Sequence, residues 1–232
     1  MKRALLLDAL GTLLELEPPV APLRRELRER FGIELSADEA GAALRAEIAF
    51  YRAHHDDASD RERLADLRRR AASALRAALP PGPARELPLA PLTDALLAAL
   101  RFRPFDEVPE VLGAAREQGV RLVVVSNWDV SLHDVLADTG LAPLLDGVVT
   151  SAEVGSAKPD GAIFARGLAL AGVDAHEALH VGDSVEHDVA GARAAGIAAV
   201  LVARNGSGPD APLPDEVPAI SSLRPLLRML NA

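Results

Sequence analysis

Short apolar segments recur along the chain, and most of them are followed by a pattern with helical spacing. The apolar segments occupy residues 4–7, 120–125, 147–150, 178–181 and 197–202. Because they are nearly continuous rather than alternating, they are typical of parallel strands that are buried on both faces. The helical patterns follow at residues 130–139, 159–171 and 187–195. This alternation of strand and helix predicts an α/β fold with a Rossmann-like, doubly wound parallel sheet.

A long helical insertion interrupts this alternation, because the first two predicted strands are too far apart for one ordinary crossover. Within it, Leu64, Leu67, Ala71 and Leu75 form an apolar stripe at helical spacing. We therefore predict a core of residues 1–14 and 104–232 and an inserted all-helical cap of residues 15–103. A loop rich in Pro and Gly is expected at residues 205–218, followed by a last short strand and helix.

Composition excludes several functional classes. The chain has no cysteine, so disulfides, thiolate metal sites and a cysteine nucleophile are ruled out. Its net charge of −9 and its 3% of aromatic residues disfavour nucleic acid as a partner. No apolar segment approaches the roughly 20 residues that a membrane-spanning helix needs. We expect a cytoplasmic protein that acts on a small molecule and has no membrane or nucleic-acid partner.

Polar side chains follow the predicted strands at the edge where such sheets bind ligands. Asp8 follows the first strand, Ser126 the second and Asp183 the fourth, and Lys158 precedes a helix. A carboxylate can attack phosphorus and form an aspartyl-phosphate. Two carboxylates can hold Mg²⁺, which prefers oxygen ligands, while a hydroxyl and an ammonium bind phosphate oxygens. These residue types together indicate phosphoryl transfer.

The same residues, in this order, resemble the four motifs of the haloacid dehalogenase superfamily, in the branch with a helical cap after the first strand. Asp8 matches the nucleophile, Ser126 the hydroxyl residue of the second motif and Lys158 the lysine of the third. Asp183 and Asp188 match the acidic pair of the fourth motif. The resemblance implies an Mg²⁺-dependent hydrolase of a small phosphorylated metabolite, which works through an aspartyl-phosphate on Asp8.

The resemblance also implies a role for each site residue. Asp8, Ser126 and Lys158 are the expected catalytic residues. Mg²⁺ would be held by Asp8, Asp183 and the backbone carbonyl of Leu10. Asp188 is expected to orient Lys158 or a metal-bound water rather than touch the ion. The expected phosphate-binding residues are Ala9, Leu10, Ser126, Asn127 and Lys158.

Leu10 departs from the family's pattern. Phosphatases of the family usually carry a second Asp at this position, two residues after the nucleophile, which protonates the leaving group. Help of this kind is worth about 10²–10⁴-fold in rate. Leu10 can still offer its backbone carbonyl, so the expected metal site is retained while leaving-group chemistry is weakened.

Two other functions stay open. Metal-free 2-haloacid dehalogenases of the family also lack the second Asp, but their fourth motif usually has Ser and Asn where this chain has Gly182 and Asp183. A weakly active protein that binds a phosphorylated ligand for regulation is the other alternative. His133 or His187 could replace the missing acid, although a solvated helix surface is the simpler interpretation of each. Trp128 could line the pocket or pack in the core.

Overall fold

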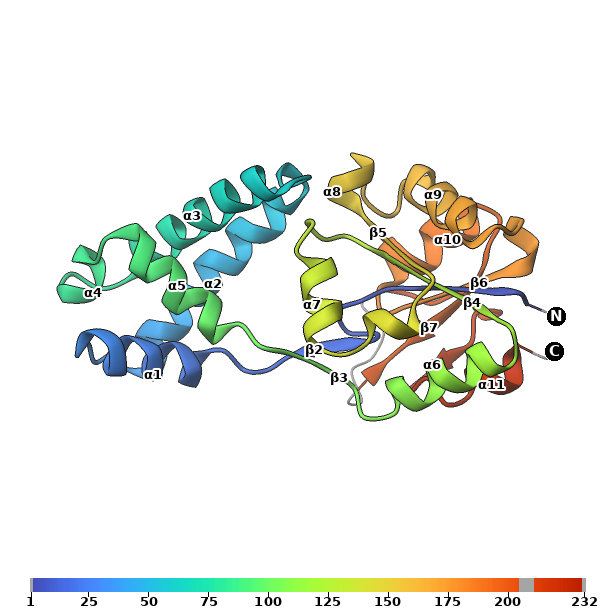
Figure 1. Ribbon diagram of the computed structural model, residues 1–232, viewed down its shortest axis with the longest axis horizontal. Coiled ribbons are helices and arrows are strands. Elements are labelled where there is room, and N and C mark those ends of the chain that lie inside the picture. The colour runs from blue at the N-terminus through green and yellow to red at the C-terminus, as the bar shows by residue number, and fades with distance from the viewer. Residues whose placement is uncertain (1, 205–210, 231–232) are drawn as a thin grey trace. The chain divides into compact units, whose positions relative to one another are not determined.

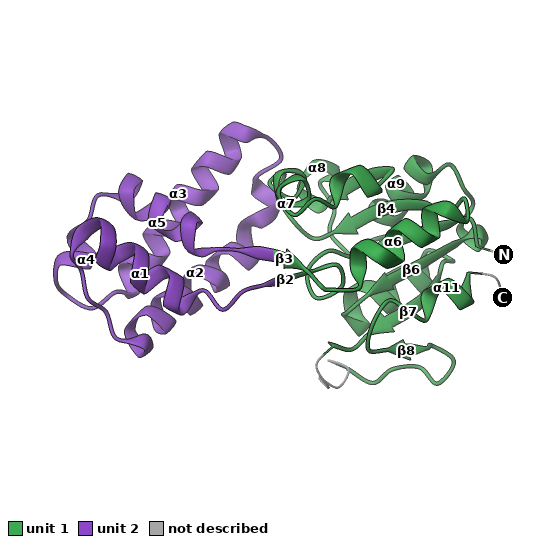
Figure 2. Ribbon diagram, turned by 60° about the horizontal axis from the view of Figure 1, so that its bottom comes forward, with its two compact units in different colours: residues 1–15, 103–232 green, residues 16–102 purple. Residues whose placement is uncertain are grey.

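The computed structural model describes residues 2–204 and 211–230. Residues 205–210 of the predicted loop lie outside the described residues. The chain divides into a core unit, residues 1–15 with 103–232, and a helical unit, residues 16–102 (Figure 2). The chain passes between the units through β2 (Leu14–Leu16) and β3 (Phe102–Pro104), which pair in a two-stranded sheet.

The core unit is built on a six-stranded parallel sheet with the strand order β5-β4-β1-β6-β7-β8 (Figure 1). The strands are β1 (Ala4–Leu7), β4 (Arg121–Ser126), β5 (Gly147–Thr150), β6 (Ala178–Gly182), β7 (Ala198–Val202) and β8 (Ala219–Ile220). In register, Leu7 of β1 lies opposite Val124 of β4 and Val181 of β6. The predicted α/β sheet is therefore confirmed, with strand boundaries that differ by one residue at most.

Helices cover both faces of this sheet, with α9 and α10 on one side and α6 and α11 on the other (Figure 1). The helices of the core unit are α6 (Val108–Glu117), α7 (Leu132–Asp138), α8 (Ser151–Val154), α9 (Gly161–Ala171), α10 (Gly191–Ala194) and α11 (Leu226–Met229). Short 3₁₀ turns, η2 (Ala142–Leu144) and η3 (Ala175–Glu177), connect some of them. Phe164 of α9 packs against Leu6 and Val125 in the main core cluster.

The helix predicted at residues 187–195 needs a correction. The chain instead forms a π-helix, η4 (Val185–Ala190), which continues into the short α10. The Ser184 side chain accepts a hydrogen bond from the N–H of His187, and the Ser184 N–H donates to Asp188 Oδ2 at 3.0 Å. These bonds turn Asp188 inward, and π-helical turns frequently occur at functional sites.

The helical unit contains five α-helices around its own apolar core. They are α1 (Val20–Phe31), α2 (Ala37–His54), α3 (Arg61–Ala78), α4 (Pro83–Glu86) and α5 (Leu89–Ala99), with the 3₁₀ turn η1 (His55–Asp57) after α2. Leu23, Leu44, Leu75 and Leu92 belong to this core. Ser36 begins α2 with a capping box to Glu39, which satisfies backbone N–H groups at the helix start. Within the described residues, no helix is both long and apolar enough to cross a membrane.

Candidate active site

The sequence-predicted site residues converge at the carboxyl ends of three adjacent strands. Asp8 directly follows β1, Ser126 is the last residue of β4 and Asp183 directly follows β6. These strands are neighbours in the order β4-β1-β6, so the parallel sheet itself brings their ends together. Lys158 lies in the segment between α8 and α9, and its side chain reaches the same edge.

Asp8 is a buried carboxylate held by two donors. Lys158 Nζ donates to Asp8 Oδ1 at 2.7 Å, and Ser126 Oγ donates to the same oxygen at 3.0 Å. Lys158 Nζ also donates to Asp188 Oδ1 at 2.5 Å. All four residues are at most 6% exposed. One ammonium is therefore shared between two buried carboxylates, in surroundings that strengthen its interaction with both.

Electrostatics distinguish the four charged groups. The two carboxylates raise the pKa of Lys158 above its usual range against the opposing effect of burial, so the lysine is an ammonium at neutral pH. Lys158 and His180 together hold the pKa of Asp188 well below its usual range despite burial. Burial raises the pKa of Asp8, and Lys158 partly offsets that rise. Partial burial, and next the charges of Asp8 and Asp188, raise the pKa of Asp183 to about 7.

The acidic residues fit a divalent cation. Asp8, Asp183 and Asp188 each offer a carboxylate oxygen, and these oxygens lie within 4.8 Å of one another. Hard oxygen donors at this density are the ligand set that Mg²⁺ prefers. Both oxygens of Asp188 already accept hydrogen bonds, whereas the Asp183 carboxylate, although partly covered by its neighbours, still reaches solvent. Asp8 and Asp183 are therefore the carboxylates best placed to hold the ion.

Glycine at position 11 gives the Asp183 carboxylate the space that it occupies. Gly11 has a φ of +82°, and a Cβ atom there would lie 2.0 Å from Asp183 Oδ2. The carbonyl of Ala9 accepts hydrogen bonds from the N–H groups of Thr12, Leu13 and Leu14, which closes a tight turn after Asp8. That turn needs a positive φ, which glycine adopts at little cost.

Leu10 projects from this turn with 40% of its surface exposed, an unusual position for a large apolar side chain. Among the described residues, it is the one large apolar side chain that counts as exposed. The position at which family phosphatases usually carry their acid is therefore solvent-accessible and apolar here. Phosphate binding by the backbone of Ala9 and Leu10 stays a prediction.

Asn127 uses its side chain to hold the lysine segment. Its Nδ2 donates to the carbonyl of Lys158 at 3.0 Å, and its Oδ1 accepts from the Lys158 N–H at 2.7 Å. These paired bonds position the backbone from which the Lys158 side chain projects. Phosphate binding by Asn127 stays a prediction.

Two residues near the site were missed in the sequence analysis. His180, in the middle of β6, lies with Nε2 2.8 Å from Asp188 Oδ1. The sequence did contain a signal for His180, because it is the one polar residue in an otherwise apolar strand, and a buried polar side chain needs a hydrogen-bond partner. Arg204 donates to the carbonyls of Gly11 and Thr12 and pairs with Glu107 at 2.9 Å, which anchors the turn after Asp8. No signal distinguished it from the other arginines of the chain.

The remaining candidates lie apart from this network. His133 is exposed and pairs with Glu153 at 3.1 Å, and His187 is exposed beside Ser184. Both lie on a helix surface, as the simpler interpretation predicted. Trp128 is only 6% exposed, which fits packing in the core.

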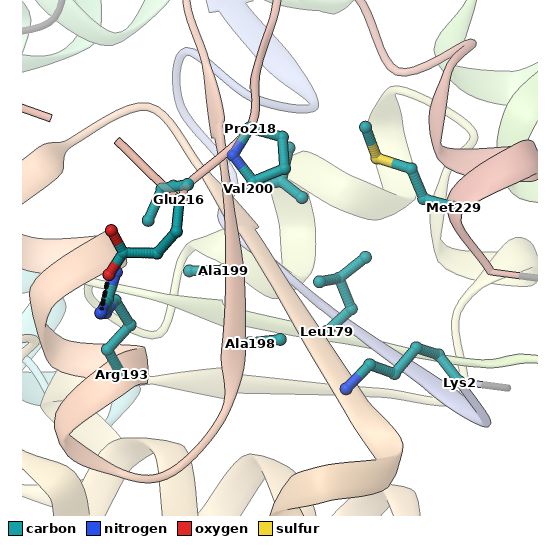
Figure 3. A pocket seen from close by; sticks show the side chains of 10 residues that line it. Lys2, Leu179, Arg193, Ala198, Ala199, Val200, Glu216, Pro218 and Met229 are labelled. Carbon is teal, nitrogen blue, oxygen red and sulfur yellow. Dashed lines mark hydrogen bonds and ion pairs between the residues drawn. The ribbon is translucent and has the colours of Figure 1, made fainter. Parts of the chain in front are cut away.

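A separate cavity of about 310 Å³ lies towards the amino ends of β6 and β7, away from the strand ends that carry the site (Figure 3). Its lining is largely apolar, with Leu179 and Val200 among the residues that form it. Its charged groups already have partners. Arg193 pairs with Glu216 at 2.5 Å, and Lys2 donates to the carbonyl of His176 at 2.8 Å.

The fold and the site together define a hydrolase with a cluster of carboxylates at the ends of its parallel strands. A model of the haloacid dehalogenase-like hydrolases matches residues 2–196, so the chain belongs to this family. The mouse haloacid dehalogenase-like hydrolase domain-containing protein 3 is 42% identical over 128 residues, which are 52% of this chain and 50% of that protein. The chain thus spans about half the length of the curated relatives it matches, among them a phosphoserine phosphatase of Thermus thermophilus (39% identity over 45% of its length).

Solved structures are similar over nearly the whole chain. A HAD phosphatase from Thermococcus onnurineus is 28% identical with a TM-score of 0.65, covering 99% of this chain and 98% of that one. A 2-haloacid dehalogenase from Pseudomonas syringae pv. Tomato is 25% identical with a TM-score of 0.68, covering 100% and 99%. The family therefore includes both of the activities considered in the sequence analysis.

Proposed function

We propose that the protein is an Mg²⁺-dependent hydrolase of small phosphomonoesters, with Asp8 as the nucleophile. The observation that carries this proposal is the buried Asp8 carboxylate, bound by Lys158 and Ser126 and close to a second carboxylate, Asp183. Relatives named as phosphatases support it, including a structure similar over the whole chain.

The chain's own groups account for the steps of the reaction. An oxygen of Asp8 attacks phosphorus while the bond from phosphorus to the leaving-group oxygen breaks, and this gives an aspartyl-phosphate and a leaving-group anion, which takes its proton from solvent. Lys158 and Ser126 bind the non-bridging oxygens and stabilise their charge. A water molecule then attacks phosphorus, which releases phosphate and restores the Asp8 carboxylate. Bound Mg²⁺, held by Asp8, Asp183 and the Leu10 carbonyl, would offset the repulsion between the anionic nucleophile and the anionic substrate.

Leu10 determines which leaving groups this site handles well. Because an exposed apolar side chain stands where family phosphatases usually carry an acid, the leaving oxygen departs without a proton from this position. Phosphates whose leaving group is already a weak base, such as aryl or acyl phosphates, are therefore the favoured substrates. Alkyl phosphates, which release an alkoxide, are disfavoured by the absence of this help.

A metal-free 2-haloacid dehalogenase is the second candidate, favoured by the residue at position 10 and by the Pseudomonas syringae structure. The Asp183 carboxylate argues against it. Without a metal ion, this carboxylate repels both Asp8 and the carboxylate of a haloacid. The charges of Asp8 and Asp188 already add to the effect of partial burial in raising the pKa of Asp183.

The experiment that separates the candidates measures turnover of p-nitrophenyl phosphate and of 2-chloropropionate, each with Mg²⁺ and with excess EDTA. The proposal predicts release of nitrophenol with Mg²⁺ only, and no release of chloride. Chloride release that persists in EDTA would establish the dehalogenase instead. Binding of inorganic phosphate with no turnover of either substrate would establish a ligand-binding protein.

A further inference from the structure

We propose that His180 is a positioning residue, which fixes the Asp188 carboxylate and, through it, the Lys158 ammonium beside Asp8. The inference rests on the proposed function only where turnover is measured. Its basis is a chain of three buried contacts from β6 to the nucleophile: His180 to Asp188, Asp188 to Lys158, and Lys158 to Asp8.

The surroundings of His180 determine which ring nitrogen carries the proton. The side chain is fully buried in β6, and its ring stands edge-on to Phe164 with centroids 5.1 Å apart. Nε2 lies 2.8 Å from Asp188 Oδ1, whereas Nδ1 has no hydrogen-bond partner among the described residues. A neutral ring with its proton on Nε2 leaves no buried N–H unpaired. His180 therefore donates to Asp188.

Asp188 has little freedom once that bond is made. Its Oδ1 accepts from both His180 and Lys158, and its Oδ2 accepts from the Ser184 N–H. The backbone of Gly182 lies so close that a Cβ atom there would be 2.1 Å from the Asp188 Cγ. Donors on both oxygens and a close backbone thus hold the carboxylate in one orientation.

Removal of the His180 donor leaves Lys158 as the one side-chain donor to Asp188 Oδ1 within the described part of the chain. The Asp188 carboxylate can then rotate about its hydrogen bond from the Ser184 N–H. The Lys158 ammonium moves with Asp188, because its contact with Asp188 (2.5 Å) is shorter than its contact with Asp8 (2.7 Å). Lys158 would shift away from Asp8, which weakens both the orientation of the nucleophile and the binding of the charge that develops on phosphate oxygens.

The test compares three variants by steady-state turnover of p-nitrophenyl phosphate with saturating Mg²⁺. His180→Leu removes the donor. His180→Gln keeps a side-chain N–H that can reach Asp188. Phe164→Leu loosens the packing around the ring and retains the bond, so it is the control for a merely structural role. Thermal unfolding of each variant is measured alongside.

We expect kcat to fall about 10–100-fold in His180→Leu, the usual loss when a residue that orients an active-site ligand is removed. KM should change much less, because Lys158 still carries its charge. His180→Gln should recover most of kcat, and Phe164→Leu should lose stability but little kcat. Equal losses in the Leu and Gln variants, or a kcat in His180→Leu within twofold of wild type, would overturn the proposal. If His180→Leu does not fold, His180→Phe, which fills the same space, replaces it under the same criteria.

A second readout works without turnover and so separates this proposal from the proposed function. Lys2 and Lys158 are the only lysines of the chain. In a Lys2→Arg background, acetylation by an amine-reactive ester, followed by peptide mass spectrometry, reports on Lys158 alone among the side chains. Faster labelling in His180→Leu than in His180→Gln and Phe164→Leu is the expected result. The same labelling rate in all three would contradict the positioning role, whatever the substrate of the enzyme proves to be.

Discussion

Replacing Lys158 by Met tests how much the ammonium shared by Asp8 and Asp188 contributes to the stability of the core unit. The side chain is 3% exposed, and its Nζ lies 2.7 Å from Asp8 and 2.5 Å from Asp188. Met retains most of the length of the side chain and none of the charge, so two buried carboxylates lose their shared cation. Removal of one partner from a buried ion pair costs about 3–5 kcal/mol, which for a chain of this size corresponds to a fall in Tm of about 6–20 °C.

The loss should depend on pH in a direction that the structure dictates. The pKa of Asp188 is held below its usual range in the folded wild type, so its contribution to stability is still present at pH 4 and is lost only below the unfolded pKa of about 3.9. In Lys158→Met that contribution is absent, and acidification from pH 7 to pH 4 protonates the crowded carboxylates of the variant and relieves their repulsion. The difference in Tm between wild type and variant should therefore be largest near pH 7 and shrink towards pH 4.

The assay is thermal unfolding followed by circular dichroism in EDTA, at pH 7 and pH 4. Lys2→Met is the matched control, because the Lys2 ammonium donates to the backbone carbonyl of His176 and forms no ion pair with a carboxylate of the described residues. A Tm for Lys158→Met that matches that of Lys2→Met at pH 7 would show that the shared ammonium does not stabilise the core unit. A loss that did not change with pH would refute its electrostatic cause.

Three other predictions follow from the same geometry. Leu10→Asp should raise kcat/KM for alkyl phosphates more than for p-nitrophenyl phosphate, by up to the roughly 10²–10⁴-fold of a positioned acid; equal losses on both would show that the acid lies elsewhere. Asp183→Ala should raise the Mg²⁺ concentration that half-maximal activity requires, or abolish activity, whereas Glu186→Ala, on the exposed side of η4, should do neither. Normal turnover in excess EDTA would show that the reaction needs no metal ion. Glu47, 4% exposed in α2, has its pKa raised to about 7 by burial, so it favours the folded state below its unfolded pKa and destabilises it as the pH rises towards 7. Glu47→Gln should therefore be more stable than wild type at pH 8, by up to about 3 kcal/mol in urea unfolding, and close to it at pH 4; identical pH profiles would contradict a buried, unpaired carboxylate.

The parts of this structure that follow general rules were predictable from the sequence. The strand β1 is a continuous apolar run, so its burial followed from hydrophobicity, and the alternation of strands with helices predicted a parallel sheet without its strand order. Once the sheet was known, Asp8, Ser126 and Asp183 had to meet, because parallel strands end at the same edge.

Contacts that depend on local geometry could not be predicted in this way. The bond between His180 and Asp188 requires the π-helix η4, and the helical pattern of residues 187–195 contains no signal for that irregular turn. Arg204 reaches the nucleophile turn from the end of β7, almost 200 residues further along the chain, and nothing in its local sequence marks it. The side chain of Asn127, for which the sequence predicted a phosphate contact that stays a prediction, also binds the backbone of Lys158. No spacing rule describes this pairing between two loops.

The central claim is that Asp8 is the nucleophile of an Mg²⁺-dependent phosphomonoesterase. Its most direct test is the rate of p-nitrophenyl phosphate hydrolysis by wild type and by Asp8→Asn, both at saturating Mg²⁺ and matched for folded protein by circular dichroism. The change is nearly isosteric and keeps an oxygen that Lys158 and Ser126 can still contact. If Asp8 is the nucleophile, the wild type turns over the substrate and Asp8→Asn does not. A rate near that of the wild type in Asp8→Asn would show that another group is the nucleophile.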